Sequence, residues 1–329
     1  MYLSIVIPIY NEVENIPLLY DAIIHSMVKI EQPWEMLLID DGSQDGSTEA
    51  LLDLAQRDPQ HVRVIVFRRN FGQTAAIAAG IDHASGEIIA LMDADLQNDP
   101  ADLPMMVAKI EDGYDVVSGW RRRRKDTFLT RTLPSHIANG LISWVTGVHL
   151  HDYGCTLKAY RREVIKGFHL YGEMHRFIPV FADAVGARII EVEVNHHPRK
   201  YGKAKYGLER TIKVVLDLVT AKFLSSYSNK PIYLFGGMGF ILVAISLVLF
   251  LFLLIRRLFW GVSVLGSPFF QTGTMLAILG VQSVLMGLIA ELLVRTYHES
   301  QNKPTYTIRK VANLDEVYPE KNSKLNSLG

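Results

Sequence analysis

Two long apolar segments constrain the fold of this chain more than any other feature of its sequence. The first runs from Ile232 to Ile255 and the second from Phe269 to Ala290, and neither contains an Asp, Glu, Lys or Arg residue. A helix needs about 20 apolar residues to cross a bilayer, and a buried helix of a soluble protein rarely stays uncharged over that length. We therefore predict two transmembrane helices, over residues 232–255 and 269–294.

The charges around these segments predict the orientation of the chain in the membrane. The short connection between them carries Arg256 and Arg257, but basic residues are more numerous at the other two ends. Those residues are Lys222, Lys230, Arg295, Lys303, Arg309 and Lys310. Because two spans return the chain to its starting side, and the first residues do not look like a signal peptide, we expect an inner or plasma membrane protein with a cytosolic N-terminal region and cytosolic termini.

The region before the apolar segments alternates between two kinds of pattern. Strand-like segments are separated by segments with helical periodicity, and the strand-like ones read LSIVIPI, EMLLID, VRVIVF, EIIALMD and YDVVSG. Continuous rather than alternating hydrophobicity is typical of strands that are covered on both faces. The pattern predicts a doubly wound α/β domain with a mostly parallel sheet.

Composition excludes some classes of protein. Lys and Arg together number 34 and so do Asp and Glu, so no overall charge favours nucleic-acid binding. The single cysteine, Cys155, excludes an intramolecular disulfide and fits a protein with its bulk in the cytosol. Neither a GxGxxG motif after the first strand-like segment nor a GxxxxGK[ST] motif is present, so dinucleotide or P-loop binding is not predicted.

Acidic residues follow three of the strand-like segments. Ligands of doubly wound sheets bind beyond the carboxyl ends of the strands, where Glu12, Asp40, Asp41, Asp93 and Asp95 are expected. In an extended chain residues i and i+2 share a face, so the last two could hold one hard cation, or they could form a solvated turn. The pair Asp40 and Asp41 could bind N–H and hydroxyl groups of a nucleoside, or cap the helix that begins at STEALL.

Three later segments have two interpretations each. The basic run WRRRRKD, residues 120–126, could contact a polyphosphate or an anionic lipid, or could be a solvated face. The segment 134–149 has apolar residues at helical spacing, which fits a helix at the membrane interface or one packed on the core. The same two interpretations apply to residues 208–224.

Several motifs in one order resemble a known family. They are SIVIPIYNE, LLIDDGSQDGS, the stretch from Asn70 to Pro100, DYGCTLKAYRR, and RKYGKAKYG followed by the two apolar segments. From about Leu3 to Tyr297 the chain resembles the polyprenyl-phosphate glycosyltransferases, which are the dolichol-phosphate mannose synthase-like members of the inverting glycosyltransferase family 2. It is most similar to the bacterial glucosyl and aminoarabinosyl transferases, so the resemblance implies a GT-A fold followed by interfacial helices and a two-helix hairpin.

The resemblance implies roles on the side of the nucleotide-sugar donor. The residues that would hold the nucleoside are Pro8, Tyr10, Glu12, Asp40 and Asp41, with Asp41 near the base. Asp93 would lie at the diphosphate and, with Asp95 and Gln97, would hold a divalent metal, Mg²⁺ or Mn²⁺. Metal and cations would neutralise the leaving diphosphate.

The resemblance also implies roles on the side of the lipid acceptor. The residues near the acceptor phosphate would be Arg121, Arg131, Ser135 and Lys203, and the catalytic residues would be Asp95, Asp152, Arg199 and Lys205. The basic loop departs from the family pattern R-x-x-G-x-S-K, because Ala204 replaces the Ser. Asp152 could be a catalytic base or a structural partner of Lys158 or Arg161.

The implied reaction is the inverting transfer of a sugar, with glucose from UDP-glucose as our expectation, to undecaprenyl phosphate. A phosphate monoester has a second pKa of about 6, so this acceptor needs little help from a base. The alternatives are transfer of mannose from GDP-mannose, a membrane polysaccharide synthase, and a nucleotide-sugar sensor without activity. A polysaccharide synthase normally has more spans and a QxxRW-type motif, which this chain lacks.

These observations predict four parts of the chain. Residues 1–207 form the catalytic domain, 208–228 an interfacial helix, 229–298 the hairpin and 299–329 a cytosolic tail. Residues 304–311 in that tail look strand-like and could pair with the edge of a neighbouring subunit. The resemblance makes a homotetramer possible.

Overall fold

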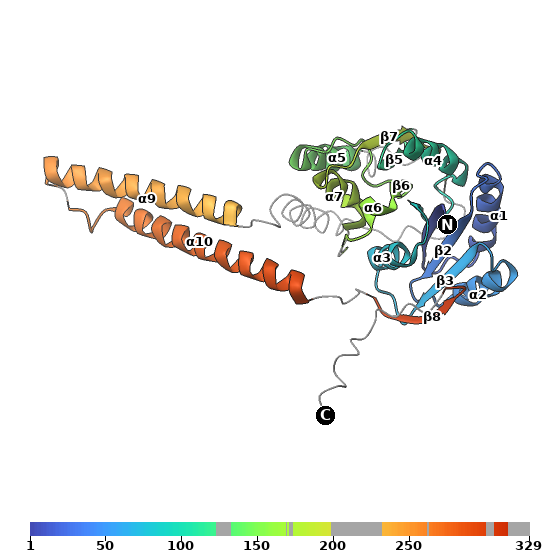
Figure 1. The fold of residues 1–329 in the computed structure, drawn as a ribbon. Coiled ribbons are helices and arrows are strands. Elements are labelled where there is room, and N and C mark those ends of the chain that lie inside the picture. Colours follow the sequence, from blue (N-terminus) through green and yellow to red (C-terminus); the bar gives the residue numbers. More distant parts are fainter. Residues whose placement is uncertain are drawn as a thin grey trace, which may run out of the picture. The chain divides into compact units, whose positions relative to one another are not determined.

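The computed structural model describes residues 1–122, 133–168, 170, 174–198, 232–261, 263–300 and 306–314 (Figure 1). The chain divides into two units, one of Met1–Ala221 together with Pro304–Gly329 and one of Lys222–Lys303. The C-terminal residues therefore group with the N-terminal domain, whereas the sequence predicted a separate tail from residue 299.

The first unit is built on a mixed sheet with the strand order β7-β5-β6-β4-β1-β2-β3-β8. The strands are β1 (Leu3–Ile9), β2 (Trp34–Asp40), β3 (Val62–Phe67), β4 (Ile88–Leu91), β5 (Val116–Trp120), β6 (Lys158–Arg161), β7 (Ile189–Glu193) and β8 (Ile308–Ala312). Strands β4, β1, β2 and β3 run parallel, as the continuous apolar segments predicted, and all five predicted strands are present. Strands β5 and β7 run in the same direction as these four, so the sheet is mostly parallel as predicted, with β6, between β4 and β5, and β8, at the edge, running antiparallel.

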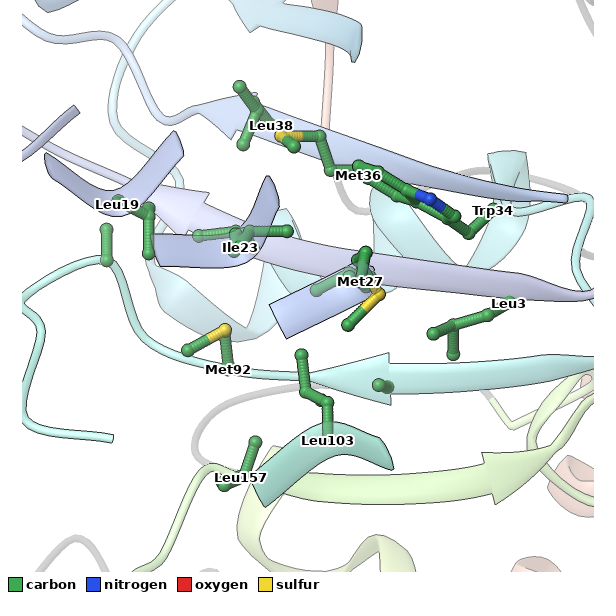
Figure 2. Packing of buried hydrophobic residues seen from close by; sticks show 14 of the residues in the cluster. Leu3, Leu19, Ile23, Met27, Trp34, Met36, Leu38, Met92, Leu103 and Leu157 are labelled. Atoms are coloured by element: carbon green, nitrogen blue, oxygen red, sulfur yellow. The ribbon is translucent and has the colours of Figure 1, made fainter. Parts of the chain in front are cut away.

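Helices connect these strands. They are α1 (Ile16–Met27), α2 (Ser47–Arg57), α3 (Gln73–His83), the 3₁₀ turn η1 (Pro100–Asp102), α4 (Leu103–Glu111), α5 (Leu133–Thr146), α6 (Arg162–Ile165), the 3₁₀ turn η3 (Met174–Phe177) and α7 (Ile178–Ala184). Figure 2 shows Leu19, Ile23 and Met27 of α1 pointing toward the apolar side chains of the neighbouring strands. Residues at this spacing lie on one face of a helix, so α1 covers the sheet with a single apolar stripe.

The structure supports core packing for part of segment 134–149, which includes most of helix α5. Ile142 and Val148 are buried in a cluster with Phe177, so this part of the segment packs on the core. Trp144 lies on the other side of the helix and is 81% exposed. The second predicted interfacial segment, residues 208–224, lies outside the described residues.

The strand-like C-terminal segment forms β8, which pairs antiparallel with β3 of the same chain (Figure 1). A neighbouring subunit was the partner suggested by the sequence, and the structure shows an intramolecular partner instead. This strand follows the two apolar helices and still belongs to the sheet of the first unit. The chain therefore leaves this unit and returns to it, as two membrane crossings require.

The second unit is a hairpin of two long helices, α9 (Ile232–Trp260) and α10 (Pro268–Ser300), which lie side by side (Figure 1). Both are long and apolar enough to cross a membrane. Arg256 and Arg257 lie inside α9. The sequence analysis had instead placed them in the connection between the two predicted spans. Many large apolar side chains on both helices are exposed, among them Phe240, Leu247 and Leu285, as expected of surfaces that face lipid.

Small residues bring the two helices of the hairpin close together. A Cβ atom on Gly239 would lie 2.6 Å from the carbonyl oxygen of Gly280, and one on Gly280 would lie 2.8 Å from that of Gly239. The Ser246 hydroxyl donates to the carbonyl oxygen of Gly273 at 2.7 Å. Close backbone approach and hydroxyl hydrogen bonds are typical of helix packing in membranes.

Candidate active site

The acid pair Asp93 and Asp95 follows β4 at the carboxyl end of the sheet. Asp93 accepts hydrogen bonds from Gln73 Nε2 (2.8 Å, to Oδ1) and from the Thr156 hydroxyl (2.7 Å, to Oδ2). The backbone N–H of Gln97 donates to Asp95 Oδ1 at 3.1 Å. Leu96, between them, has a φ of 60°, which is uncommon for a bulky residue and marks a tight turn after the acid pair.

The electrostatics of the acid pair suit a cation. Burial and the neighbouring charge of Asp95 raise the pKa of Asp93 to about 6, while Thr156 and the charges of Arg121 and Arg176 lower it. Among the described residues each oxygen of Asp93 accepts one hydrogen bond, and a carboxylate oxygen has two lone pairs, so room for a metal bond remains. A divalent cation would relieve the repulsion that keeps this pKa high.

The donor set is compatible with Mg²⁺ or Mn²⁺. Within the described residues, no group of three or more His, Cys, Asp or Glu side chains is placed to hold a metal ion. Mg²⁺ commonly takes one or two carboxylates and completes its shell with water and substrate phosphates. Asp93 and Asp95 fit that pattern, so the residues present fit a metal that is shared with a diphosphate.

The predicted nucleoside residues lie at the ends of β1 and β2. Pro8 lies near the end of β1, and Tyr10 and Glu12 lie in the loop that follows it. The backbone N–H of Glu12 donates to the Ser47 hydroxyl at 3.0 Å, and a Glu12 carboxylate oxygen accepts from Asn15 Nδ2 at 2.6 Å. These contacts fix the loop after β1 against the start of α2.

Asp40 and Asp41 have different partners. Asp40 accepts from the backbone N–H of Ser43 at 2.9 Å and from the hydroxyl of Thr48, in the first turn of α2. Asp41 accepts instead from the backbone N–H groups of Phe71 and Gly72, at 2.6 and 2.9 Å. The helix-capping interpretation is wrong for both residues, because the N-cap of α2 is Gly46 and no side chain caps it. Asp40 contacts the first turn of α2 only through the Thr48 hydroxyl.

Burial raises the pKa of Asp41 to about 6. The two backbone donors of Phe71 and Gly72 act in the opposite direction, and the charge of Asp40 adds to the increase. These two donors are neutral, so the Asp41 carboxylate keeps a full negative charge when it is ionised. Such a group is an acceptor for an N–H of a nucleobase.

Hydrogen bonds join the loops after β1, β2 and β3 into one surface. Asn11 donates its backbone N–H to the Ser43 hydroxyl and accepts at Oδ1 from the backbone N–H of Gln44, at 2.9 and 2.8 Å. Gly42 has a φ of 72°, and a Cβ there would lie 2.6 Å from the carbonyl carbon of Arg69. Only glycine fits this close approach between the loops after β2 and β3.

On the other side of the acid pair, Arg121 and Asp152 form a bidentate ion pair. Arg121 Nε donates to Asp152 Oδ2 at 2.7 Å, and Nη2 donates to Oδ1 at 3.0 Å. The Asp152 side chain is 1% exposed and that of Arg121 17%. Although burial opposes it, Asp152 raises the pKa of Arg121 above its ordinary value.

This ion pair corrects the partners predicted for Asp152. Arg161 pairs with Asp115 at 3.2 Å. Lys158, whose pKa is lowered by burial, donates to the backbone carbonyl oxygens of Tyr153 (3.2 Å) and Cys155. Lys158 thus holds the backbone of the loop that carries Asp152, while the charge of Asp152 is balanced by Arg121.

The loop 152–156 connects the ion pair to the acid pair. Its first residue, Asp152, holds Arg121, and its last, Thr156, donates to Asp93. Between them Cys155 is buried, and burial raises the pKa of its thiol to about 11. Cys155 therefore stays a protonated packing residue at neutral pH.

Part of the predicted site lies outside the described residues. Arg131, Arg199, Lys203 and Lys205 are among the residues that are not described, and so is the position of Ala204. Ser135 belongs to α5, where the structure describes the backbone but not its side chain. Their predicted roles in phosphate binding and catalysis therefore remain predictions.

The sequence interpretation missed three residues of the site. Gln73 and Thr156 contact Asp93 directly, and the charge of Arg176 acts on it. Gln73 lies in the motif NFGQTAAIAAG, to which no role was assigned, and Thr156 lies in DYGCTLKAY, where only Asp152 was assigned a role. Arg176 belongs to η3, which carries no acid pattern to draw attention to it.

Comparison with known proteins identifies the family. Residues 4–168, which include the acid pair and the Arg121–Asp152 pair, match the family model described as Glycosyl transferase family 2. The chain is a family 2 glycosyltransferase. Within this family it belongs with the polyprenyl-phosphate glycosyltransferases, because it is similar to two such proteins over nearly its whole length.

The first of these relatives of the glycosyltransferase is a dodecaprenyl-phosphate galacturonate synthase from Rhizobium johnstonii. It is 42% identical over 312 residues, which cover 94% of this chain and 92% of the relative. The second is an undecaprenyl-phosphate 4-deoxy-4-formamido-L-arabinose transferase from Proteus mirabilis, 38% identical over 325 residues, or 98% of this chain and 96% of the relative.

The solved structures support the fold of the glycosyltransferase. The crystal structure of glucosyl-3-phosphoglycerate synthase from Mycobacterium tuberculosis with phosphoglyceric acid matches with a TM-score of 0.50 and 18% identity. The match covers 68% of this chain and 79% of that one. At this identity the similarity shows the GT-A-like architecture alone.

Proposed function

We propose that this glycosyltransferase transfers galacturonate from a UDP-sugar to a polyprenyl phosphate at the cytosolic face of a bacterial inner or plasma membrane. The observation that carries the proposal is the 42% identity to the galacturonate synthase, which extends over 94% of the chain. The match therefore continues beyond the family 2 residues 4–168 into the apolar hairpin.

The sugar in this proposal differs from the one expected from the sequence. Glucose was the expectation, but neither of the two relatives carries glucose in its name. A second candidate is 4-deoxy-4-formamido-L-arabinose, which the 38% identical relative supports. Because selection between sugars depends on the shape of the pocket and on single hydrogen bonds, a donor panel is the direct way to choose.

The acid pair supports the donor half of this reaction. A divalent cation on Asp93 and Asp95 would supply positive charge to the diphosphate leaving group. Gln73 and Thr156 orient the Asp93 carboxylate through its two oxygens, so the side chain is already in position before the donor binds. Asp41 follows β2 at the same edge of the sheet. We assign it to binding of the nucleobase.

The ion pair supports the acceptor half. An Arg side chain has five N–H groups, and in this chain two of those of Arg121 donate to Asp152. The other N–H groups can donate to the phosphate of the lipid. Because that phosphate is already ionised near neutral pH, orientation of the nucleophile matters more than removal of a proton.

The test is a donor panel with purified protein in mixed micelles of detergent and undecaprenyl phosphate. We expect incorporation of label into lipid from UDP-galacturonate, and at least 10-fold less from UDP-glucose or GDP-mannose, in line with rejection by a site that binds specific polar groups. Preference for the UDP-formamido-arabinose would establish the second candidate. Incorporation from UDP-glucose alone would refute the proposal.

The same assay separates the other classes of protein. A polysaccharide synthase would produce polymer without a lipid phosphate, and a sensor would bind the donor without turnover. The hairpin comprises two candidate spans among the described residues, and β8 returns the chain to the first unit, which supports cytosolic termini. A homotetramer and the choice between Mg²⁺ and Mn²⁺ remain predictions from the resemblance.

A further inference from the structure

A pocket of about 260 Å³ lies beside the predicted nucleoside residues, at the carboxyl ends of β1, β2 and β3. Its lining includes Tyr10 after β1, Ser43 after β2 and Asn70 after β3. It also includes Arg309, which belongs to β8 and so comes from the segment after the hairpin. Among the residues that the structure describes, no acidic side chain is part of this lining.

A β-bulge directs Arg309 into this pocket. Along the β3–β8 pair, Val66 lies opposite Lys310 and Phe67 lies opposite Ile308, so Arg309 has no opposite residue on β3. It is the extra residue of the bulge. Bulges interrupt the alternation of side chains in a strand, and they often change the direction of a side chain next to a binding site.

Contacts at both ends hold β8 in place. The Tyr306 ring stacks on Phe67 with centroids 5.2 Å apart, and its hydroxyl donates to Asp82 at 2.8 Å. At the other end Asn313 Nδ2 donates to the carbonyl oxygens of Ala55 and Val62, at 2.7 and 3.0 Å. Arg309 is thus carried by a strand that is anchored on both sides of it.

The strand order places the pocket at the base end of a bound donor. From the acid pair after β4, the sheet edge continues through β1 and β2 to β3 and β8. Neighbouring strands are about 4.8 Å apart, so β3 lies roughly 14 Å from β4 along this edge. A nucleotide with its diphosphate at Asp93 and its ribose and base along this edge reaches Asp41 and then the pocket.

We propose that Arg309 is a donor-binding residue that contacts the base of the nucleotide sugar, either by donating to a carbonyl oxygen of the base or by stacking on its face. This inference rests on the proposed function, since it assumes a nucleotide donor. Arg309 differs from Arg69, another cation of the lining, whose guanidinium already lies 4.3 Å from the Phe71 ring. The segment after the hairpin therefore completes the donor site of the first unit.

The experiment measures the binding of three probes to the full-length protein in detergent by calorimetry, with weak binders measured in competition. UDP contains base, ribose and diphosphate, uridine lacks the diphosphate, and inorganic pyrophosphate lacks the base. We expect Arg309→Ala to weaken UDP and uridine about 10-fold, the effect of one lost charge-assisted hydrogen bond, and to leave pyrophosphate unchanged. The KM for the donor should rise by a similar factor with little change in kcat.

Two further variants make the result specific. Lys310→Ala changes the next cation of β8, which lies opposite Val66 and outside the pocket lining, and should bind all three probes like the wild type. Arg309→Lys keeps the charge without the planar guanidinium and should recover only part of the affinity for uridine. Thermal melting of each variant identifies any loss of folding, and Arg309→Lys then provides the comparison if Arg309→Ala is unstable.

The possible failures can be distinguished. If the wild type binds UDP and Arg309→Ala binds it equally well, the inference is wrong and the proposed function stands. If Arg309→Ala weakens pyrophosphate as much as UDP, the arginine contacts phosphate and the assignment to the base is wrong. If the wild type does not bind UDP, the proposed function fails, and the inference fails with it.

Discussion

The carboxylates on the two sides of the acid pair have different hydrogen-bond partners. On the donor side, Asp41 accepts hydrogen bonds from two backbone N–H groups, which carry no net charge. On the acceptor side, Asp152 is bound through both oxygens by the guanidinium of Arg121. Asp41 therefore keeps its negative charge, whereas the charge of Asp152 is balanced by Arg121.

This difference matches the chemistry of the two substrates. A nucleobase offers N–H groups, which are bound by a carboxylate that keeps its charge. A lipid phosphate is a dianion, which an uncompensated carboxylate would repel. In the proposed function, the ion pair would place a guanidinium beside the acceptor without leaving a second negative charge there. Variants that change the charge on one side alone can therefore break or sharpen this comparison.

The largest effect is expected at the acid pair, which would hold the metal at the leaving diphosphate. Asp95→Asn should abolish measurable transfer and Asp93→Asn should reduce kcat about 10³-fold, because an amide is a weaker ligand than a carboxylate for a hard cation. The measurement is initial rate against Mg²⁺ and Mn²⁺ concentration.

A surface aspartate gives the matched control for the acid pair. Asp112→Asn changes an exposed residue whose side chain pairs with Lys109, and it should leave the rate unchanged. Near-normal turnover of the wild type in the presence of a strong chelator would show that the reaction needs no divalent metal, and the assignment of Asp93 and Asp95 would be wrong.

The second effect concerns the acceptor side. Asp152→Asn should lower kcat/KM for the lipid phosphate about 10- to 100-fold and change donor affinity little, because Arg121 loses its orientation. Removing one partner of a buried ion pair should also cost about 3 kcal/mol of stability, measurable by thermal or denaturant unfolding. Arg121→Ala combined with Asp152→Ala should be less harmful than the sum of the two single changes.

A pH–rate profile at saturating lipid phosphate decides between positioning and base catalysis. We expect the profile of Asp152→Asn to keep the shape of the wild-type profile at a lower level. Suppose instead that the wild type shows an essential deprotonation that Asp152→Asn removes, with both affinities unchanged. Asp152 would then be a base, and the difference between the two sides would have to be explained in another way.

The third and smallest effect is a pH dependence on the donor side. The pKa of Asp41 is raised to about 6, so its carboxylate is mostly ionised at pH 7.5 and mostly protonated at pH 5. The N–H groups of the nucleobase need the ionised Asp41 carboxylate to accept their hydrogen bonds. The KM for the nucleotide-sugar donor should therefore increase by up to about 10-fold between pH 7.5 and 5. Asp41→Asn should show a high KM at both pH values, and an equal pH dependence in this variant would exclude Asp41 as its source.

The sequence indicated the shared location of the donor-side acids but not the partner of Asp152, for a physical reason. Asp41 and Asp93 directly follow strands, and the carboxyl ends of parallel strands meet at one edge, so local pattern is sufficient to bring them together. Arg121 and Asp152 are separated by 30 residues, and their contact depends on how β6 inserts antiparallel between β4 and β5. Spacing in the sequence therefore suggested the nearby cations Lys158 and Arg161 instead.

The C-terminal strand shows the same limit. The segment 304–311 was recognised as strand-like from its composition, but its partner is decided by tertiary structure. The stacking of Tyr306 on Phe67 joins segments more than 200 residues apart. Likewise, the length of the helices in the hairpin followed from hydrophobicity, whereas the close contact of Gly239 with Gly280 did not.

The central claim is that an acceptor phosphate, positioned by the Arg121–Asp152 pair, attacks the donor sugar directly in one displacement. The most direct test is nuclear magnetic resonance of the lipid product formed by purified protein from UDP-galacturonate and undecaprenyl phosphate. The account predicts a sugar joined to the lipid phosphate with the anomeric configuration opposite to that of the donor. A product with the donor's configuration, or free sugar with no lipid product, would contradict it.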